Sequence, residues 1–110
     1  MNGLFINDRG HFADAAGAWG VWRPRAAGFG GVGPSLADVD GDGLFDLFVA
    51  NYGPSVLYRN DRRQRFIDVT RDVGLGFEGH AVTSSWGDYD NDGRPDLYVS
   101  GFLATEAALS

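Results

Sequence analysis

Cysteine and lysine are both absent from the 110-residue sequence. Without cysteine the chain can form neither disulfide bonds nor thiolate zinc sites. Without lysine the glycine-rich stretch GFGGVGP at residues 28–34 cannot be a phosphate-binding loop of the G-x-x-x-x-G-K type. Fifteen acidic residues outnumber nine basic ones, all arginine, and the net charge is −6. Nucleic acids and anionic membranes need a basic surface, so we expect neither as a partner.

Long apolar segments are absent as well. No run approaches the roughly 20 apolar residues of a membrane-spanning helix, so we expect no membrane insertion. The first residues, MNGLFINDRGHF, lack the charged and apolar regions of a signal peptide. No segment has a sustained periodicity of 3.6 residues. ADAAGAW at residues 13–19 is rich in alanine but is interrupted by Gly17, so we expect no helix there.

The composition is that of one small globular domain, with 44% hydrophobic and 22% charged residues. Seventeen glycines and fifteen aromatic residues indicate many short strands joined by tight turns. The acidic residues are not spread evenly, because eight of the fifteen lie in two short clusters. The charge is therefore a local feature of those clusters.

The sequence repeats itself. DVDGDGLFDLFVAN at residues 38–51 returns as DYDNDGRPDLYVSG at residues 88–101, an offset of 88 − 38 = 50. A second, looser pair relates LFINDRGHFAD at residues 4–14 to LYRNDRRQRFID at residues 57–68, where Asn7 and Asp8 answer Asn60 and Asp61. A unit of about 50 residues is typical of propeller blades and other repeat folds.

Each repeat unit contains four predicted strands. DLFVAN at 46–51 and DLYVSG at 96–101 are apolar runs with β-branched and aromatic residues. VLYRN at 56–60 and FIDVT at 66–70 alternate apolar and polar residues, as strands near a sheet edge do. SLADVD at 35–40 and TSSWGDYD at 83–90 would lead into the acidic loops. The expected fold is all-β, with about two four-stranded antiparallel blades' worth of a β-propeller.

We expect residues 1–110 to form a single partial propeller region. Its parts would be the second half of a blade plus a linker at 3–34, one full blade at 35–75 with its loop at 38–46, and the first half of the next blade at 80–102 with its loop at 88–96.

Each acidic loop has the pattern D-x-D-x-D-G-x-x-D. Alternate side chains converge on one point when the backbone curls, and a glycine at position 6 can take the positive φ that completes the curl. The carbonyl at position 7 would add another oxygen. About six to eight oxygen ligands suit Ca²⁺, whereas Mg²⁺ needs a tighter octahedron. The sequence therefore predicts two calcium sites, with ligands Asp38, Asp40, Asp42, Leu44 and Asp46 in the first and Asp88, Asp90, Asp92, Arg94 and Asp96 in the second.

Two other interpretations of the loops explain less. An EF-hand needs a Glu at position 12 between two helices, but Val49 and Val99 stand there and the flanks are predicted strands. A solvated turn without an ion would explain one loop, but not two loops in the same register, each ahead of an apolar strand. Crowded carboxylates repel one another unless a cation lies between them.

The loops and their strands resemble the FG-GAP or VCBS-type repeats of integrin-like β-propellers, in which this loop binds Ca²⁺. The resemblance is to the bacterial and cartilage-acidic-protein branch that often carries an ASPIC/UnbV segment. It lies in WGDYDNDGRPDLYV at 86–99 and in LYRNDRRQRFIDVTRDVGL at 57–75, and extends over roughly residues 4–101. Phe29 and Gly30 stand where the FG pair would, but ANYG and SGFL replace the GAP triplet. That departure argues against integrin-type ligand binding.

The number of blades is too small for a closed propeller, which uses about four to eight. The sequence holds one whole blade with half a blade on each side, and FLATEAALS at 102–110 is poor strand sequence. We therefore expect a piece of a longer propeller, whose remaining blades are its partners. The rival is a ring of copies, in which residues 96–102 pair with residues 4–7 of a neighbour.

Several other side chains have a structural and a functional interpretation. His11 and His80 lack a partner pattern for catalysis or metal binding. The arginines of RNDRRQR at 59–65 form a solvated hairpin tip or contact an anion or acidic glycan. Trp19, Trp22 and Trp86 could stack on sugars, but Trp86 immediately precedes an acidic loop and is expected to pack between blades.

The expected function is that of a calcium-binding propeller repeat module for protein or glycan binding or for scaffolding, without catalytic residues. We expect a secreted, periplasmic or cell-surface location, because weak calcium sites stay largely empty at cytosolic calcium levels. The alternative is the propeller portion of a secreted polysaccharide lyase or hydrolase. That enzyme would need a cluster of His, Tyr, Arg or carboxylate side chains separate from the loops, and the sequence shows none.

Overall fold

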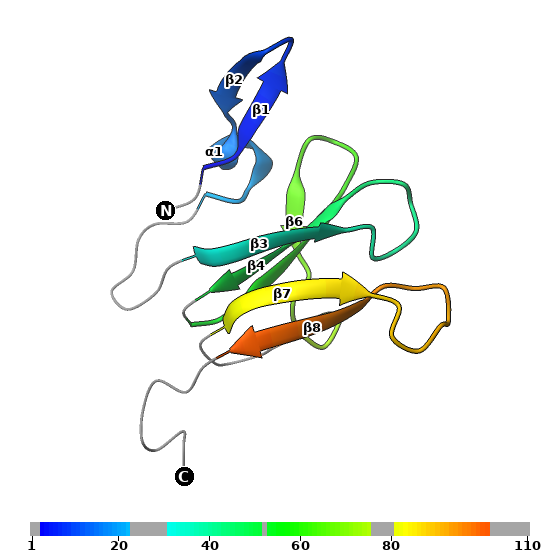
Figure 1. The fold of residues 1–110 in the computed structure, drawn as a ribbon. Helices are drawn as coiled ribbons and strands as arrows, with labels where there is room; N and C mark the ends of the chain where they lie inside the picture. Colours follow the sequence, from blue (N-terminus) through cyan, green and yellow to red (C-terminus); the bar gives the residue numbers. More distant parts are fainter. Residues whose placement is uncertain (1–2, 23–30, 52, 76–80, 102–110) are drawn as a thin grey trace.

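Antiparallel sheets make up almost all of the computed structural model, which describes residues 3–22, 31–51, 53–75 and 81–101 (Figure 1). Within these ranges eight strands form one four-stranded sheet and two two-stranded sheets. The all-β prediction is confirmed. The elements in chain order are β1 (Phe5–Asp8), β2 (His11–Asp14), α1 (Ala16–Trp19), β3 (Gly31–Ala37), β4 (Asp46–Asn51), β5 (Val56–Asn60), β6 (Phe66–Asp68), β7 (Ala81–Gly87) and β8 (Asp96–Gly101).

The four-stranded sheet is one complete blade with the strand order β3-β4-β5-β6. The two-stranded sheets are β1-β2 and β7-β8. The β7-β8 pair repeats the β3-β4 pair in register, since Ala37 faces Asp46 and Gly87 faces Asp96. Both pairs have an irregularity at the same place, between Gly31 and Gly33 and between Ala81 and Thr83. The 50-residue repeat is therefore a repeat of strand pairing as well as of sequence.

Strand β5 lies inside the blade, between β4 and β6, so the expectation that VLYRN runs near a sheet edge was wrong. Val56, Leu57 and Tyr58 are all buried. The alternation of apolar and polar residues did not indicate the place of this strand in the sheet, because both of its faces are covered. The next strand, β6, is the edge strand and ends at Asp68, shorter than the predicted FIDVT. Thr70 continues the pairing through its side chain, because its Oγ1 accepts a hydrogen bond of 2.9 Å from Leu57 N.

The blade has a hydrophobic cluster on each face. Val49, Val56 and Tyr58 pack with Ala16 and Val21 on one face. The residues at the alternate positions, Phe48, Ala50 and Leu57, pack with Ala81 on the other, where Trp86, Leu97 and Val99 join them. The two-residue period of the strands divides the side chains between these clusters. Each face of the complete blade is thus covered by one of its two neighbours in the chain.

A single helical turn, α1, stands where no helix was expected, so that prediction was wrong. Asp14 Oδ1 accepts a hydrogen bond of 3.0 Å from Ala16 N at its start, and Gly20 ends it at a φ of 85°. Ala16 is buried against the blade. The turn forms because this contact outweighs the weak helix propensity of Gly17. No helix within the described ranges has the length and hydrophobicity needed to cross a bilayer.

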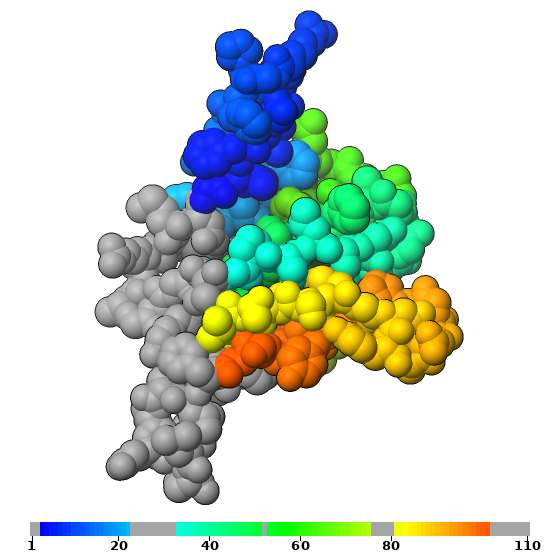
Figure 2. Space-filling model, in the orientation of Figure 1, coloured from blue at the N-terminus to red at the C-terminus, as the bar shows by residue number. Residues whose placement is uncertain are grey.

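Strands β3 and β7 lie side by side, which brings the complete blade against the β7-β8 sheet (Figure 2). A Cβ on Gly33 would lie 3.3 Å from Val82 O, so this approach favours glycine. Ser35 and Ser84 are joined through their hydroxyls at 2.7 Å. Trp86 donates from Nε1 to Ser35 Oγ at 3.0 Å and meets the Phe48 ring edge-on at 6.5 Å. The expectation that Trp86 packs between blades is confirmed.

Candidate metal centres

The two acidic loops connect equivalent strands in neighbouring sheets. One joins β3 to β4 and the other joins β7 to β8. Because β3 and β7 run side by side, the loops lie at the same end of the two sheets (Figure 1). In each loop the last aspartate is also the first residue of the following strand, Asp46 of β4 or Asp96 of β8. The strands therefore determine where both loops sit.

The first aspartate of each loop organises the backbone that follows it. Asp38 accepts hydrogen bonds from three backbone amides, those of Gly41 at 2.9 Å, Asp42 at 3.2 Å and Gly43 at 2.8 Å. Asp88 accepts the equivalent bonds from Asp92 at 3.0 Å and Gly93 at 2.8 Å. A carboxylate that accepts several amide hydrogens holds a short loop curled in the absence of any other ligand.

The residues at the fifth and ninth positions also make the same contacts in both loops. Oδ1 of Asp42 accepts from Leu44 N at 3.0 Å, and Oδ1 of Asp92 accepts from Arg94 N at 2.9 Å. Oδ2 of the ninth residue reaches back to the second position of its own loop. Asp46 accepts from Val39 N and Asp96 accepts from Tyr89 N, each at 2.9 Å. Each loop is thus closed from its end to its beginning.

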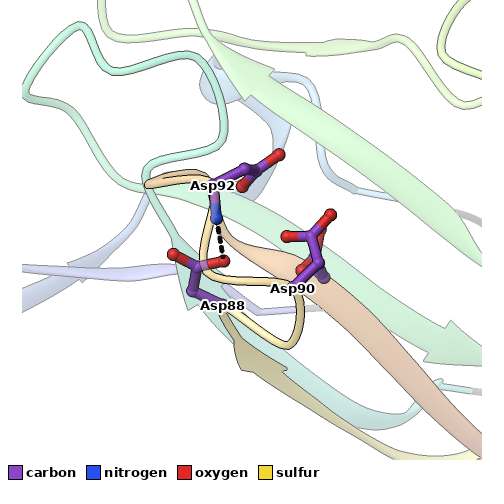
Figure 3. A group of neighbouring side chains, drawn as sticks. Asp88, Asp90 and Asp92 are labelled. Carbon is purple, nitrogen blue, oxygen red and sulfur yellow. Dashed lines mark hydrogen bonds between the residues drawn. The ribbon is translucent and has the colours of Figure 1, made fainter.

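The carboxylates gather in both loops. In the second loop, Asp88, Asp90, Asp92 and Asp96 each place one oxygen so that all four lie within 4.8 Å of one another. Figure 3 shows the first three of them around the loop, with the bond from Asp92 N to Asp88. In the first loop the same holds for Asp38, Asp40 and Asp42. Within the described residues these are the two groups of three or more acidic or histidine side chains with this spacing.

Asp46 lies outside the first group although Asp96 belongs to the second. It is fully buried, and its Oδ1 accepts a hydrogen bond of 2.8 Å from Asn60 N at the end of β5. The other oxygen accepts from Val39 N. Asp46 therefore ties the loop to β4 and β5. Its predicted role as a metal ligand, like that of the carbonyls of Leu44 and Arg94, stays a prediction.

The backbone takes the left-handed conformation twice in each loop. Gly43 and Gly93 at position 6 both have a φ of 86°, as the curl requires. Position 4 is left-handed as well, with a φ of 74° at Gly41 and 60° at Asn91. The left-handed conformation at position 4 was not predicted. Its signal is the exchange of Gly for Asn between the repeats, since these two residue types tolerate a positive φ best.

The loop environment moves the carboxylate pKa values in opposite directions. Hydrogen bonds from the amide of Gly43 above all lower the pKa of Asp38, and the amide of Gly93 does the same for the pKa of Asp88. Loss of hydration among the loop atoms is the largest cause that raises the pKa of Asp40 and of Asp90, and neighbouring carboxylates raise it further. A cation placed among these oxygens would reverse the repulsion.

Two arginines contact the loops. Arg94 Nε lies 3.7 Å from Asp92 Oδ2, but both side chains are exposed, so the pair contributes little to stability. Arg62 reaches from the β5-β6 turn and donates from Nη2 to the backbone carbonyl oxygen of Asp42. Arg59, Arg63 and Arg65 are exposed, as expected of a solvated hairpin tip. The contact made by Arg62 shows that this tip also supports the first loop.

The remaining candidates lie away from the loops or outside the described residues. His11 is the exposed first residue of β2, and His80 is not among the described residues. Trp19 packs on Phe66 with ring centroids 5.5 Å apart, whereas the exposed fraction of Trp22 is 49%. The loops are therefore the best-supported site. Their donors are all oxygen atoms, mostly charged, and this chemistry fits a hard cation such as Ca²⁺.

Comparisons with known proteins match the region that contains both loops. A family whose description is FG-GAP-like repeat matches residues 38–99, more than half of the chain. Cartilage acidic protein 1 of Homo sapiens is 34% identical over 87 aligned residues, which cover 71% of this chain and 13% of the relative. Cartilage acidic protein 1 of Mus musculus is 33% identical with the same coverage. The chain spans 13% of the length of these two curated relatives.

Proposed function

The chain belongs to the FG-GAP-like repeat family, and from this premise we propose that each of its two aspartate loops binds one calcium ion. The proposed module stabilises adjoining propeller blades through these ions and serves protein or glycan binding or scaffolding, without catalysis of its own. That the chain is a β-propeller-like repeat module follows from the family and from the all-β fold. Calcium binding and the role of the module are the proposal.

The single observation that carries the proposal is the repetition of one oxygen-lined loop at two places 50 residues apart. The loops share their left-handed positions and the amide contacts of their first, fifth and ninth residues. An acidic turn that served only solubility would have no reason to repeat these contacts. Asp40 and Asp90 at position 3 are exposed, so their oxygens are accessible to an ion.

The proposed ligands are the side chains of Asp38, Asp40 and Asp42 in the first loop and of Asp88, Asp90, Asp92 and Asp96 in the second, with the carbonyls of Leu44 and Arg94. Asp46 is included as a ligand that keeps its amide contacts, because a carboxylate oxygen has two lone pairs. Flexible loops with many oxygen donors favour Ca²⁺ over Mg²⁺, which holds its water more tightly.

Calcium also supports a proposed location outside the cytoplasm. Sites of this kind bind with a dissociation constant on the order of 10⁻⁴ to 10⁻³ M, and such sites fill only where calcium is abundant. The secreted, periplasmic and cell-surface compartments meet that condition. Two bound Ca²⁺ ions would add four positive charges and change the net charge of the chain from −6 to −2.

The test is the stoichiometry of calcium binding by isothermal titration calorimetry. We expect two equivalents for the chain and one for Asp92→Ala, because that change removes an oxygen from the second loop and frees the amide of Arg94. Asp72→Ala is the matched control, since it removes the same charge from an exposed position outside the loops and should leave two equivalents. Absence of binding at millimolar calcium would refute the proposal, and so would two equivalents in Asp92→Ala.

A further inference from the structure

The turn between β5 and β6 lies beside the first acidic loop (Figure 1). Two residues of this turn donate hydrogen bonds to the loop. Asn60 donates from its backbone N–H to Oδ1 of Asp46 at 2.8 Å. Arg62 donates from Nη2 to the backbone carbonyl oxygen of Asp42. The turn therefore contacts the loop at its fifth and ninth positions, and both residues there are proposed calcium ligands.

The bond from Arg62 fixes one peptide group of the loop, the group between Asp42 and Gly43. Its carbonyl oxygen accepts from Arg62, and its N–H donates to Oδ2 of Asp38 at 2.8 Å. Because a peptide group is planar, bonds on both sides of it also fix the orientation of the two adjoining Cα atoms. One of these atoms carries the Asp42 carboxylate, and the other belongs to Gly43, whose φ of 86° completes the curl of the loop.

The turn that carries Arg62 is itself held by hydrogen bonds. Asp61 N donates to the carbonyl oxygen of Arg65 at 3.0 Å, which closes the turn. The side chain of Asn60 accepts from Arg62 N at 3.0 Å, and that of Asp61 accepts from Arg63 N at 2.9 Å. The guanidinium of Arg62 therefore extends from an ordered backbone, which lowers the entropy lost when it bonds to the loop.

The backbone conformation of Arg62 also indicates that its side chain has a role. Its φ is 70°, in the left-handed region where glycine is favoured. The looser repeat has the same feature, because Arg9 answers Arg62 in the turn between β1 and β2 and has a φ of 54°. The conformation of these turns does not explain a long side chain at this position. For Arg62, the contact with the acidic loop does.

We propose, on the basis of the proposed calcium binding, that Arg62 is a positioning residue of the first calcium site. It is not a ligand, since a guanidinium has only donors and stays charged. It holds the Asp42 peptide so that the Asp42 carboxylate stays within 4.8 Å of those of Asp38 and Asp40. Calcium binding and the conformation of the β5-β6 turn are therefore coupled, and the coupling acts in both directions.

The charge of Arg62 acts on calcium affinity in the opposite direction to its contact. A guanidinium repels a nearby cation, so removal of the charge alone would strengthen calcium binding. Water and salt weaken this repulsion because the side chain is exposed. Loss of the contact leaves the Asp42 peptide without one of its two partners and weakens calcium binding. We expect the contact to outweigh the charge, so the sign of the change in affinity tests the proposal.

Calcium titration by calorimetry in the Asp92→Ala background measures the first loop alone. There Arg62→Gly should weaken calcium binding by about three- to tenfold, the range expected for an exposed charged hydrogen bond. Glycine fits the positive φ, so the substitution removes the side chain without straining the turn. Arg63→Gly is the matched control, because it removes the same charge from the next, exposed residue and also introduces a glycine. It should change the affinity by less than about twofold.

Three further measurements separate positioning from other effects. The weakening by Arg62→Gly should persist in about 0.5 M salt, which screens charge effects. In the Asp42→Ala background, which leaves only the second loop, Arg62→Gly should not change the affinity. Urea unfolding in EDTA should show equal stability for Arg62→Gly and Arg63→Gly.

The outcomes distinguish this proposal from the proposed function. Unchanged or stronger binding by the first loop in Arg62→Gly, or equal weakening in Arg63→Gly, would overturn the role of Arg62 and leave calcium binding intact. Weakening of the second loop, or a loss of stability confined to Arg62→Gly in EDTA, would also overturn it. Absence of calcium binding by the Asp92→Ala chain itself would refute the proposed function and this inference together.

Discussion

Two aspartates at the same position of the repeat have different surroundings. Asp46 is fully buried and accepts backbone hydrogen bonds on both carboxylate oxygens, from Val39 and Asn60. Asp96 is only half-buried, and the described part of the chain provides it with one such bond, from Tyr89. Both would contribute to calcium binding in the proposed function. Asp46 in addition holds β4 and β5 together whether or not an ion is bound.

This difference predicts unequal costs of removing the two carboxylates. In EDTA, Asp46→Ala should lower the free energy of unfolding by about 3 kcal/mol, because two partly buried N–H groups lose a charged acceptor. Asp96→Ala should lower it by about 1 kcal/mol, because one exposed bond is lost. Urea unfolding of each variant in EDTA measures both costs. Equal costs would contradict the structural role of Asp46.

The pKa directions predict how calcium binding depends on pH. Protons compete with Ca²⁺ for the carboxylates, so affinity should fall first as pH drops through the raised pKa values of Asp40 and Asp90. It should fall further as pH drops through the lowered pKa values of Asp38 and Asp88, below the ordinary value of 3.8. Calcium titrations at a series of pH values measure this. Replacing Asp40 and Asp90 by Asn should remove the first decline, and an unchanged pH profile would contradict the assignment.

Without calcium the same groups act on stability with opposite signs. Asp38 and Asp88 have lowered pKa values in the folded state, so the stability they contribute is present above pH 3.8 and is lost as pH falls through those lowered values. Asp40 and Asp90 have raised pKa values, so their protonation in the folded state relieves a penalty as pH falls through those values. The two effects offset each other in part. The pH dependence of calcium affinity should therefore exceed that of stability in EDTA.

Between elements, the contact of β3 with β7 depends on a few polar and aromatic side chains. Trp86 donates to Ser35 Oγ and packs edge-on against Phe48. Ser35 also bonds Ser84. Trp86→Phe should lower the free energy of unfolding by about 1 to 2 kcal/mol, because one hydrogen bond is lost and the smaller ring fills less of the contact with Phe48.

A double-mutant cycle of Trp86→Phe with Ser35→Ala separates the hydrogen bond from the packing. The coupling energy should be about 0.5 to 1 kcal/mol, since both single changes remove the same bond. Denaturant unfolding of the four proteins provides the measurement. Additive effects of the two substitutions would mean that the bond between the blades contributes nothing to stability.

Most of the elements could be predicted from the sequence because their signals are local. The 50-residue offset located β4 and β8, and the glycine at position 6 predicted the left-handed turns at Gly43 and Gly93. The strands before the loops were predicted at 35–40 and 83–90, but β3 and β7 begin earlier and end before the first aspartate of each loop. Strand β5 was misplaced near an edge because its burial depends on what covers the two faces of the blade. The turn α1 was missed for a similar reason, since it depends on the contact that buries Ala16.

Some features of the candidate site could likewise be predicted from the local sequence, and others could not. Seven of the eight loop aspartates gather as their spacing predicted, because alternate positions of a curled loop converge. Asp46 departs from the group because Asn60, 14 residues further along, is the partner of its Oδ1. The hydrogen bond by which Arg62 supports the first loop also joins residues that are 20 positions apart in the sequence. Contacts of this length depend on the fold and leave no signal in the spacing of the loop.

For the whole molecule, calcium should act as a stabilising ligand. A site at a free calcium concentration of about one hundred times its dissociation constant adds about 2.7 kcal/mol to the free energy of unfolding. EDTA should therefore lower the melting temperature by several degrees, and excess calcium should restore it. Magnesium at the same concentration is the control and should restore less. A melting temperature that EDTA leaves unchanged would contradict ion binding at either loop.

The close approach of Gly33 to Val82 determines how an array of such blades curves. Small residues, Gly33, Ser35 and Ser84, line the contact between β3 and β7, whereas the strands further out bring bulkier side chains such as Leu57 and Leu97 between the same two sheets. Neighbouring sheets that are close on one side and held apart on the other form a wedge. Replacing Gly33 by a larger residue would flatten that wedge, so successive blades would extend as a ribbon where the native residue bends them toward closure.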